Sequence, residues 1–192
     1  MTRIKLALPL ALLLSACAAT PPVPDVYYRL DLPDVARLGS LERSIVVEPV
    51  RAQGVYAERP LLYANGSTLR QYAHHFWAEP PALALQGALM EALRGAGATQ
   101  VRSADLRTVG DLVIRSRLRR MELVTDTAEP RALLAIDFTV SDRSGAVLLS
   151  QQFEKTRHLD EAAPEPYVEA VAALAADACT ALAQALWARP AN

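Results

Sequence analysis

Alternation of apolar and polar residues with a period of two marks the candidate strands of this chain. Residues 26–32 place Tyr28, Leu30 and Leu32 on one face, as expected for a strand. Alternation or a β-branched run also predicts strands over residues 44–50, 112–120, 131–141 and 146–157. The last two flank residues 142–145, whose turn chemistry predicts a hairpin. The phase breaks at Arg119 and Arg120, where we expect a β-bulge or a strand end.

Apolar residues recur at three- and four-residue spacing in two further segments, which predicts two helices. The first begins at Pro80-Pro81 and ends near Arg94, before two glycines. The second spans residues 165–188, whereas residues 51–80 have the least regular pattern. This order of elements predicts a single α+β domain over residues 26–190. We expect a mostly antiparallel sheet with two main helices packed on one face.

The first sixteen residues have the three parts of an export signal: a basic start, an apolar stretch and small residues before a cut. The apolar stretch, Leu6–Leu14, is about half as long as a bilayer-spanning helix. Leu14 to Cys17 resembles the lipobox of bacterial lipoproteins. The resemblance implies a signal peptide over residues 1–16 and acylation (palmitate) of Cys17; an ordinary secretory signal is the alternative. Residues 17–25, rich in proline, predict an extended tether.

Composition and charge narrow the class of protein. Removal of residues 1–16 moves the formal net charge from −1 to about −3, and no strongly basic region typical of nucleic-acid binding stands out. Cys179 has no intramolecular partner once Cys17 is acylated, so we expect no internal disulfide. It lies in an alanine-rich helical pattern, which favours a small buried hydrophobe over a reactive or intermolecular thiol.

Candidate catalytic and metal-binding residues are few. His74 and His75 are adjacent, and neighbours on a strand point to opposite faces, so we expect no shared metal ion. The serines lack nucleophile motifs, and no glycine-rich phosphate loop occurs. Arginines at 115, 117 and 119 suit phosphate head groups, but the favoured interpretation is a solvated sheet face opposite acidic neighbours such as Asp137. We therefore predict a protein that is not an enzyme and needs no cofactor.

Phe76 and Trp77 directly precede the first predicted helix. Two bulky aromatic residues at this position are typical of a hydrophobic staple, which packs the preceding strand onto the helix. The alternative is an exposed contact with a partner subunit, because aromatic residues are enriched in such contacts.

Three sets of residues carry a family resemblance. They are Tyr27-Tyr28-x-Leu30; Val47-x-Pro49-Val50 followed by Gly54-x-Tyr56 and Arg59-Pro60; and, most specific, Trp77-Ala78-Glu79-Pro80 at a helix start. In this order and spacing the chain resembles the ABC-type transport auxiliary lipoprotein family, which includes the intermembrane-transport lipoprotein of the Pqi type. The similarity runs from about residue 27 to residue 186. Pro81 departs from it, since leucine is frequent there in relatives.

The resemblance implies a docking role as an accessory component of an MCE/ABC-type system that moves lipids or other hydrophobic molecules between membranes. The implied partners are the MCE-type tunnel (substrate-binding) protein, its ABC permease system and, through the acyl anchor, outer-membrane lipid. Family members lie on the periplasmic face of the outer membrane, and some assemble into homo-oligomeric rings. Ala18 after the cysteine matches the outer-membrane sorting habit of enteric lipoproteins.

We expect the contact surface in the irregular segment, because loops on a rigid sheet carry function. Its candidate residues are aromatic: Tyr56, Tyr63, Tyr72, Phe76 and Trp77. Two other classes stay open. One is an envelope-assembly lipoprotein that supports insertion of outer-membrane protein or lipopolysaccharide. The other is a lipid-anchored hydrolase, for which the sequence offers no convergent polar site.

Overall fold

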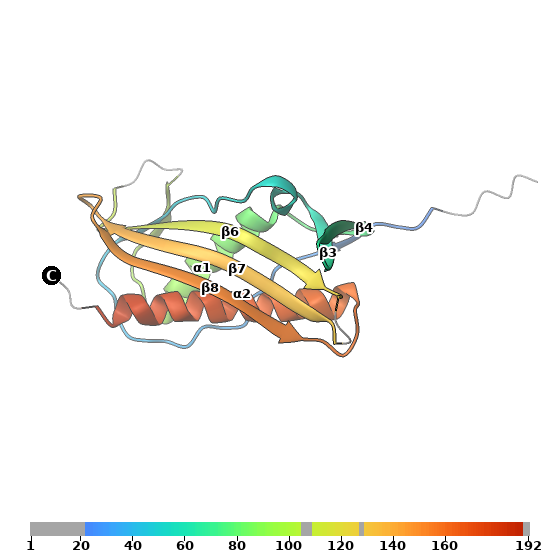
Figure 1. The fold of residues 1–192 in the computed structure, drawn as a ribbon. Helices are drawn as coiled ribbons and strands as arrows, with labels where there is room; N and C mark the ends of the chain where they lie inside the picture. The colour runs from blue at the N-terminus through green and yellow to red at the C-terminus, as the bar shows by residue number, and fades with distance from the viewer. Residues whose placement is uncertain (1–21, 105–108, 127–128, 190–192) are drawn as a thin grey trace, which may run out of the picture.

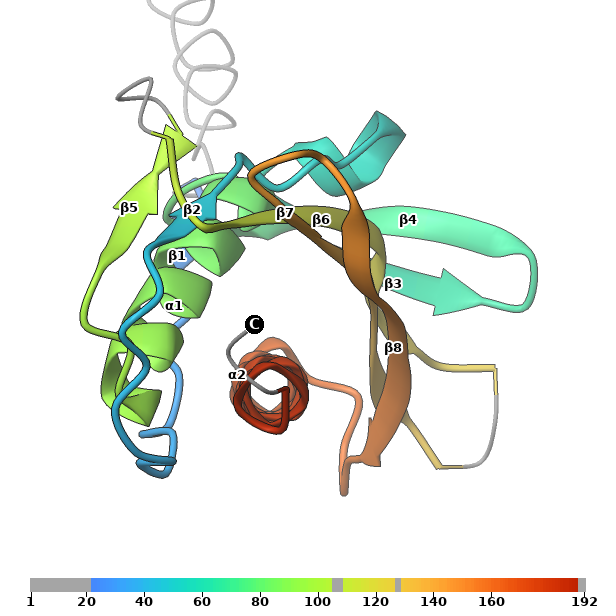
Figure 2. The same cartoon turned by 90° about the vertical axis from the view of Figure 1, so that its left-hand side faces the viewer.

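The computed structural model describes residues 22–104, 109–126 and 129–189. Within these residues eight strands form one curved sheet (Figure 1). Two α-helices lie inside the curve, as the end-on view in Figure 2 shows. The predicted α+β fold, with two main helices on one face of a sheet, is confirmed.

Three long strands form the antiparallel centre of the sheet: β6 (Leu112–Val124), β7 (Arg131–Asp142) and β8 (Val147–His158). β7 and β8 form the hairpin that the sequence predicts. The register of β6 against β7 shifts between Leu118 and Arg120. This shift confirms the β-bulge expected where two successive arginines interrupt the alternation.

Two groups of shorter strands lie at the other edge of β6, and the first strand of each group pairs with β6 in parallel. Near its start, β6 pairs with β2 (Ile45–Val47), which pairs with β5 (Val101–Ser103). Near its end it pairs with β3 (Pro60–Asn65), followed by β4 (Thr68–Trp77) and β1 (Val26–Tyr28). Antiparallel pairing dominates, but the sheet is mixed. The parallel pairs involve two or three residues each, too few to leave a periodicity in the sequence.

Residues 51–80, the least regular part of the sequence, contain the β3–β4 hairpin. Its two-residue turn is Gly66-Ser67, between the paired residues Asn65 and Thr68, and Gly66 has a φ of +58°, which favours glycine. The alternation on β4 is blurred for two reasons. Its pairing with β3 slips between Pro60 and Leu62, and nearly all of its residues are exposed or only partly buried.

Helix α1 (Pro81–Ala96) starts at a proline, as predicted, and ends at Gly97 with a φ of +116°. A Cβ atom at Gly97 would lie 1.8 Å from the carbonyl oxygen of Gly39. Only glycine therefore allows both the left-handed conformation and the close approach of the segment that follows β1.

Helix α2 (Pro164–Trp187) is long and apolar enough to cross a membrane by length and composition, with a mean hydropathy of 1.4 in its most apolar window. Its apolar stripe instead packs against β7, β8 and α1, inside the curve of the sheet (Figure 2). Val171, Leu174 and Leu182 on this stripe are at most 2% exposed. We therefore assign α2 as the central helix of the folded domain.

The hydrophobic core lies between the sheet and the two helices. Cys179 of α2 is buried there, and burial raises the pKa of its thiol to about 12, which confirms the interpretation of a small buried hydrophobe. A cavity of about 10 Å³ lies beside it, with a wholly apolar lining from both helices, β7 and Val50. This volume is about what one water molecule needs, so the cavity has no room for an acyl chain.

Candidate functional site

The predicted contact residues lie at one end of the molecule, where β1, β3 and β4 meet the C-terminal end of β6. Figure 1 shows this end on the side from which the chain enters the fold. We call it the aromatic end, defined by Tyr27, Tyr28, Tyr56, Tyr63, Tyr72, Phe76 and Trp77. Cys17 lies outside the described residues, so its acylation remains a prediction.

Trp77 ends β4 and is only 2% exposed. Its ring packs 6.2 Å from the ring of Tyr167 on α2, and its amide donates to the carbonyl oxygen of Arg59 at 2.7 Å. Of the two interpretations left open by the sequence, burial of Trp77 supports packing in the core over an exposed partner contact, but its ring packs on α2 and not on the helix that it precedes. Trp77 thus supports the aromatic end from the side of the hydrophobic core.

Tyr63 and Tyr72 form the half-buried centre of the aromatic end. Their ring centroids lie 4.9 Å apart across the β3–β4 hairpin, and Tyr72 also meets the edge of His75 at 5.7 Å. Burial, followed by the neighbouring Tyr63, raises the pKa of Tyr72. The Tyr72 phenol is therefore neutral, and the two rings form a partly exposed apolar surface with polar hydroxyls, which is typical of contact sites.

Phe76 points away from Trp77 to the other side of β4, where its ring stacks on Tyr27 of β1 at 5.6 Å. The Arg59 guanidinium lies 5.3 Å from the centre of the Tyr27 ring. Phe76 is partly buried, whereas Tyr27 is 55% exposed. This side of the aromatic end consequently presents aromatic surface beside a positive charge.

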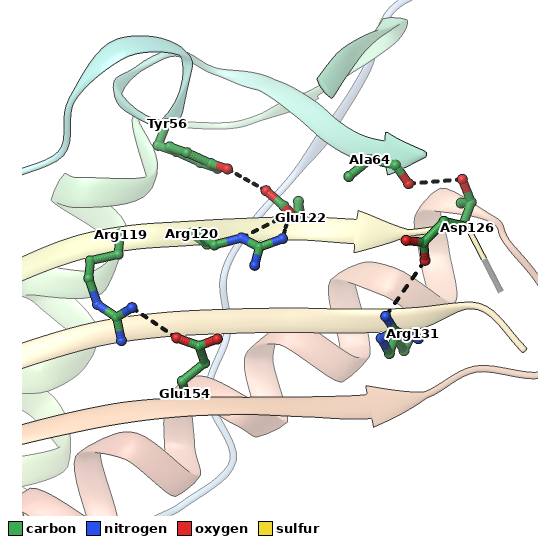
Figure 3. A network of polar contacts seen from close by, with 9 residues as sticks. Tyr56, Ala64, Arg119, Arg120, Glu122, Asp126, Arg131 and Glu154 are labelled. Carbon is green, nitrogen blue, oxygen red and sulfur yellow. Dashed lines mark hydrogen bonds and ion pairs between the residues drawn. The ribbon is translucent and has the colours of Figure 1, made fainter. Parts of the chain in front are cut away.

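Tyr56 lies on η2 (Gly54–Ala57), a single turn that crosses above β6. Figure 3 shows its hydroxyl pointing to the carboxylate of Glu122, which also accepts a bond from Arg120. The Glu122 side chain is only 2% exposed, so these two donors compensate a buried negative charge. Burial and the hydrogen bond to Glu122 raise the pKa of Tyr56 to about 12. The phenol is therefore a structural donor that fixes η2 on the sheet.

Tyr28 links the N-terminal strand to α2. Its hydroxyl donates to Glu165 Oε1 at 2.7 Å and lies 2.8 Å from Nδ1 of His75. Because its single proton goes to Glu165, the second contact requires an N–H on His75 as donor. The Tyr28 hydrogen bond is the main cause that lowers the pKa of Glu165. The sequence separates Glu165 from Tyr28 by 137 residues, so the pattern along the chain does not indicate this contact.

Tyr167 is the residue of this end that the sequence analysis missed. It is fully buried, and this burial is the main reason why its pKa lies well above the ordinary value. The nearby charges of Glu122, Tyr56 and Tyr72 raise the pKa further. Tyr167 therefore lies under the whole aromatic end and connects it to α2. The available signal was the helical spacing, since Tyr167 continues the apolar stripe four residues before Val171.

The polar side chains elsewhere pair with one another. Arg115 lies 2.9 Å from Glu48, and Arg119 lies 2.9 Å from Asp137. Arg119 also contacts Glu154 at 2.8 Å, as Figure 3 shows. These pairs fit the solvated sheet face that the sequence favoured for the arginine row. Among the described residues, no group of three or more histidine, cysteine or acidic side chains is placed to hold a metal ion.

Two comparisons bear on this geometry. A family model described as the ABC-type transport auxiliary lipoprotein component matches residues 28–183. A crystallised DUF330 protein from Xanthomonas campestris shares the fold with a TM-score of 0.77 and 14% identity, over 84% of this chain and 94% of that one. The crystal structure of an uncharacterized protein has a TM-score of 0.69 and 15% identity, over 85% and 99% of the two chains. The search of curated proteins finds no match.

Proposed function

This chain belongs to the family of ABC-type transport auxiliary lipoprotein components, and from this premise we propose that it docks onto an MCE/ABC-type system that moves lipids or other hydrophobic molecules between membranes. The observation that carries the proposal is the family match over residues 28–183, which spans nearly all of the folded domain. In this role the protein is an accessory component that binds its partners and catalyses no reaction.

The proposed anchor is an acylated Cys17 in the periplasmic leaflet of the outer membrane. Residues 22–25 are exposed and extended, as expected for a tether, and Asp25 is the first side chain with a contact to the fold, 3.0 Å from His74 Nδ1. A single acyl chain binds membranes only marginally, whereas more than one on the same cysteine gives stable attachment. The anchor thus sets the location of the domain, and the domain sets its partners.

The core itself has no room for a lipid. The 10 Å³ cavity beside Cys179 has a wholly apolar lining and is too small for an acyl chain. The proposed contact is formed by Tyr63 and Tyr72, which keep exposed surface. Trp77 and Tyr56 hold these residues in place from the core and from η2.

Co-purification tests the docking proposal. The lipidated full chain is extracted from membranes with mild detergent, and the MCE-type tunnel protein that accompanies it is quantified. We expect Tyr63→Ala with Tyr72→Ala to reduce the recovered partner about ten-fold or more, since central aromatic contacts dominate binding. Leu83→Ala is the matched control, because Leu83 is 53% exposed on α1 and lies outside the aromatic end.

Two results would contradict the proposal. One is unchanged recovery of the tunnel protein with the folded double variant. The other is recovery of a β-barrel assembly protein that does not depend on any MCE system, which would favour the envelope-assembly role instead.

The anchor is tested separately with Cys17→Ser. We expect the wild-type chain to incorporate labelled palmitate and to sediment with outer membranes. The variant should incorporate none, because the acylated thiol is gone, and should lose its membrane attachment. Palmitate on the variant, or wild-type protein free in periplasmic extract, would rule out the anchor.

A further inference from the structure

Tyr27, Phe76 and Arg59 form a compact surface beside the tether, which we call the Tyr27 patch. Tyr27 is among the most exposed large side chains of the described residues, although its neighbour Tyr28 in β1 is tied to α2. We propose that the Tyr27 patch rests on the phospholipid surface to which the chain is tethered. In this orientation Tyr27 lies among the head groups and Arg59 binds lipid phosphate. The inference rests on the proposed anchor at Cys17.

The three side chains are held in a fixed arrangement. The Tyr27 and Phe76 rings stack with an angle of 29° between their planes. Arg59 Nε donates to the carbonyl oxygen of Trp77 at 3.1 Å, and its guanidinium lies against the Tyr27 ring. Within the described part of the chain, the terminal amino groups of Arg59 have no recorded acceptor. They are therefore oriented and available for a ligand outside the domain.

The chemistry of the patch fits a phospholipid head-group layer. Tyrosine combines an apolar ring with a polar hydroxyl and is enriched at membrane–water interfaces. The guanidinium fork matches two oxygens of a phosphate, and arginine stacked on an aromatic ring loses less freedom when it binds. A bilayer surface offers phosphate and apolar boundary at once, which a purely acidic protein surface does not.

The tether length brings the patch to the membrane. Asp25 is bonded to His74, and β1 pairs with β4 from Val26 onward, so the eight residues 17–24 separate the proposed anchor from the first contact described in the fold. An extended proline-rich segment of that length reaches about 25 Å at about 3.1 Å per residue. Once the acyl chains hold the protein on the membrane, contact of the Tyr27 patch with the same membrane is effectively intramolecular. Even a weak interaction of the patch with lipid then keeps the patch bound for much of the time.

Fluorescence quenching in vesicles tests the orientation. The lipidated full chain carries one probe on Ala78→Cys, next to the patch, or on Val147→Cys at the far end of β8. Cys179 does not compete for the label, because it is buried and its thiol pKa is raised to about 12. The vesicles are phosphatidylethanolamine and phosphatidylglycerol with a fraction of brominated acyl chains, which quench only nearby probes.

We expect brominated lipid to quench the probe at position 78 about two-fold, since interfacial residues lie at the head-group boundary, and to leave the probe at 147 unchanged. Tyr27→Ser should abolish quenching at 78 while the protein stays on the vesicles. Leu83→Ser, which also replaces a large side chain by serine at nearly equal exposure, should leave it intact.

Failures of the two proposals give different results. Vesicle-bound protein with an unquenched probe at 78, or with equal quenching at both positions, would overturn the orientation and assign the patch to a protein partner. Protein that does not sediment with vesicles would overturn the anchor, and this inference with it. Circular dichroism of each variant verifies that it is folded.

Discussion

Two adjacent side chains at the end of β4 differ sharply in what they do for stability. Trp77 is buried against Tyr167, whereas Phe76 is partly buried on the opposite side of the strand. We expect Trp77→Ala to lower the free energy of unfolding by about 3–5 kcal/mol, because it leaves a large cavity in the core. Phe76→Ala should cost about 1 kcal/mol, because it gives up only partly buried area. Urea unfolding followed by circular dichroism measures both.

An equal loss in the two variants would contradict this division between support and contact surface. The division matters for the docking proposal. Only a variant that keeps its fold, such as Phe76→Ala, can report on binding of a partner.

The Tyr56 phenol makes stability depend on alkaline pH. Its pKa in the folded protein, about 12, lies above the ordinary value near 10, so its contribution is complete below pH 10 and is lost as pH rises toward 12. Tyr56→Phe should remove this part of the alkaline decline. At pH 7 it should cost about 1–3 kcal/mol, because the buried Glu122 carboxylate loses a donor. Denaturant titrations at pH 8 to 12 test this, and parallel declines in both proteins would refute it.

Helix α1 offers two glycines with opposite requirements. Gly97 is left-handed and meets the carbonyl of Gly39, whereas a Cβ at Gly87 in the middle of the helix meets no atom within 4 Å. Gly87→Ala should therefore stabilise the protein by about 0.5–1 kcal/mol, since alanine favours the helix. Gly97→Ala should destabilise it by more than that, because backbone must shift. Thermal unfolding of the two variants compares them, and the same sign of change in both would be inconsistent with this packing.

The elements that the sequence predicted well are long and have a regular spacing of apolar residues. β6 alternates in burial over its first half and both helices carry buried apolar stripes, whereas β7 is mostly buried and β8 mostly exposed, so their hairpin was predicted from residue pattern and turn chemistry. β4 escaped prediction because its contact residues are partly exposed, so its pattern carries little contrast. The aromatic set was found from composition, but its division into support and surface depends on Tyr167 and Glu165, which are distant in sequence.

At the scale of the whole molecule, Cys179 reports on global opening. It lies between both helices and the sheet, in the part of the core with the most complete burial. We expect a thiol reagent to modify Cys179 at least ~1000-fold more slowly in the native protein than in denaturant, because access requires unfolding of the core. Kinetics with an aromatic disulfide reagent measure the ratio. Fast modification at neutral pH would show that the helices separate locally.

The attachment of β1 determines how the domain responds to a mechanical force applied through its N-terminal segment. Force arriving there meets β1 first, which is held by three residue pairs with β4 and by the Tyr28–Glu165 bond. The next backbone bond along the chain joins the Leu38 amide to the Ala96 carbonyl. Detaching residues 26–38 would release about 44 Å of extended chain at ~3.4 Å per residue, but Leu30, Leu32 and Leu38 would also lose their packing on the core. The N-terminal segment therefore lengthens only under a force that breaks both the β1 pairing and these apolar contacts.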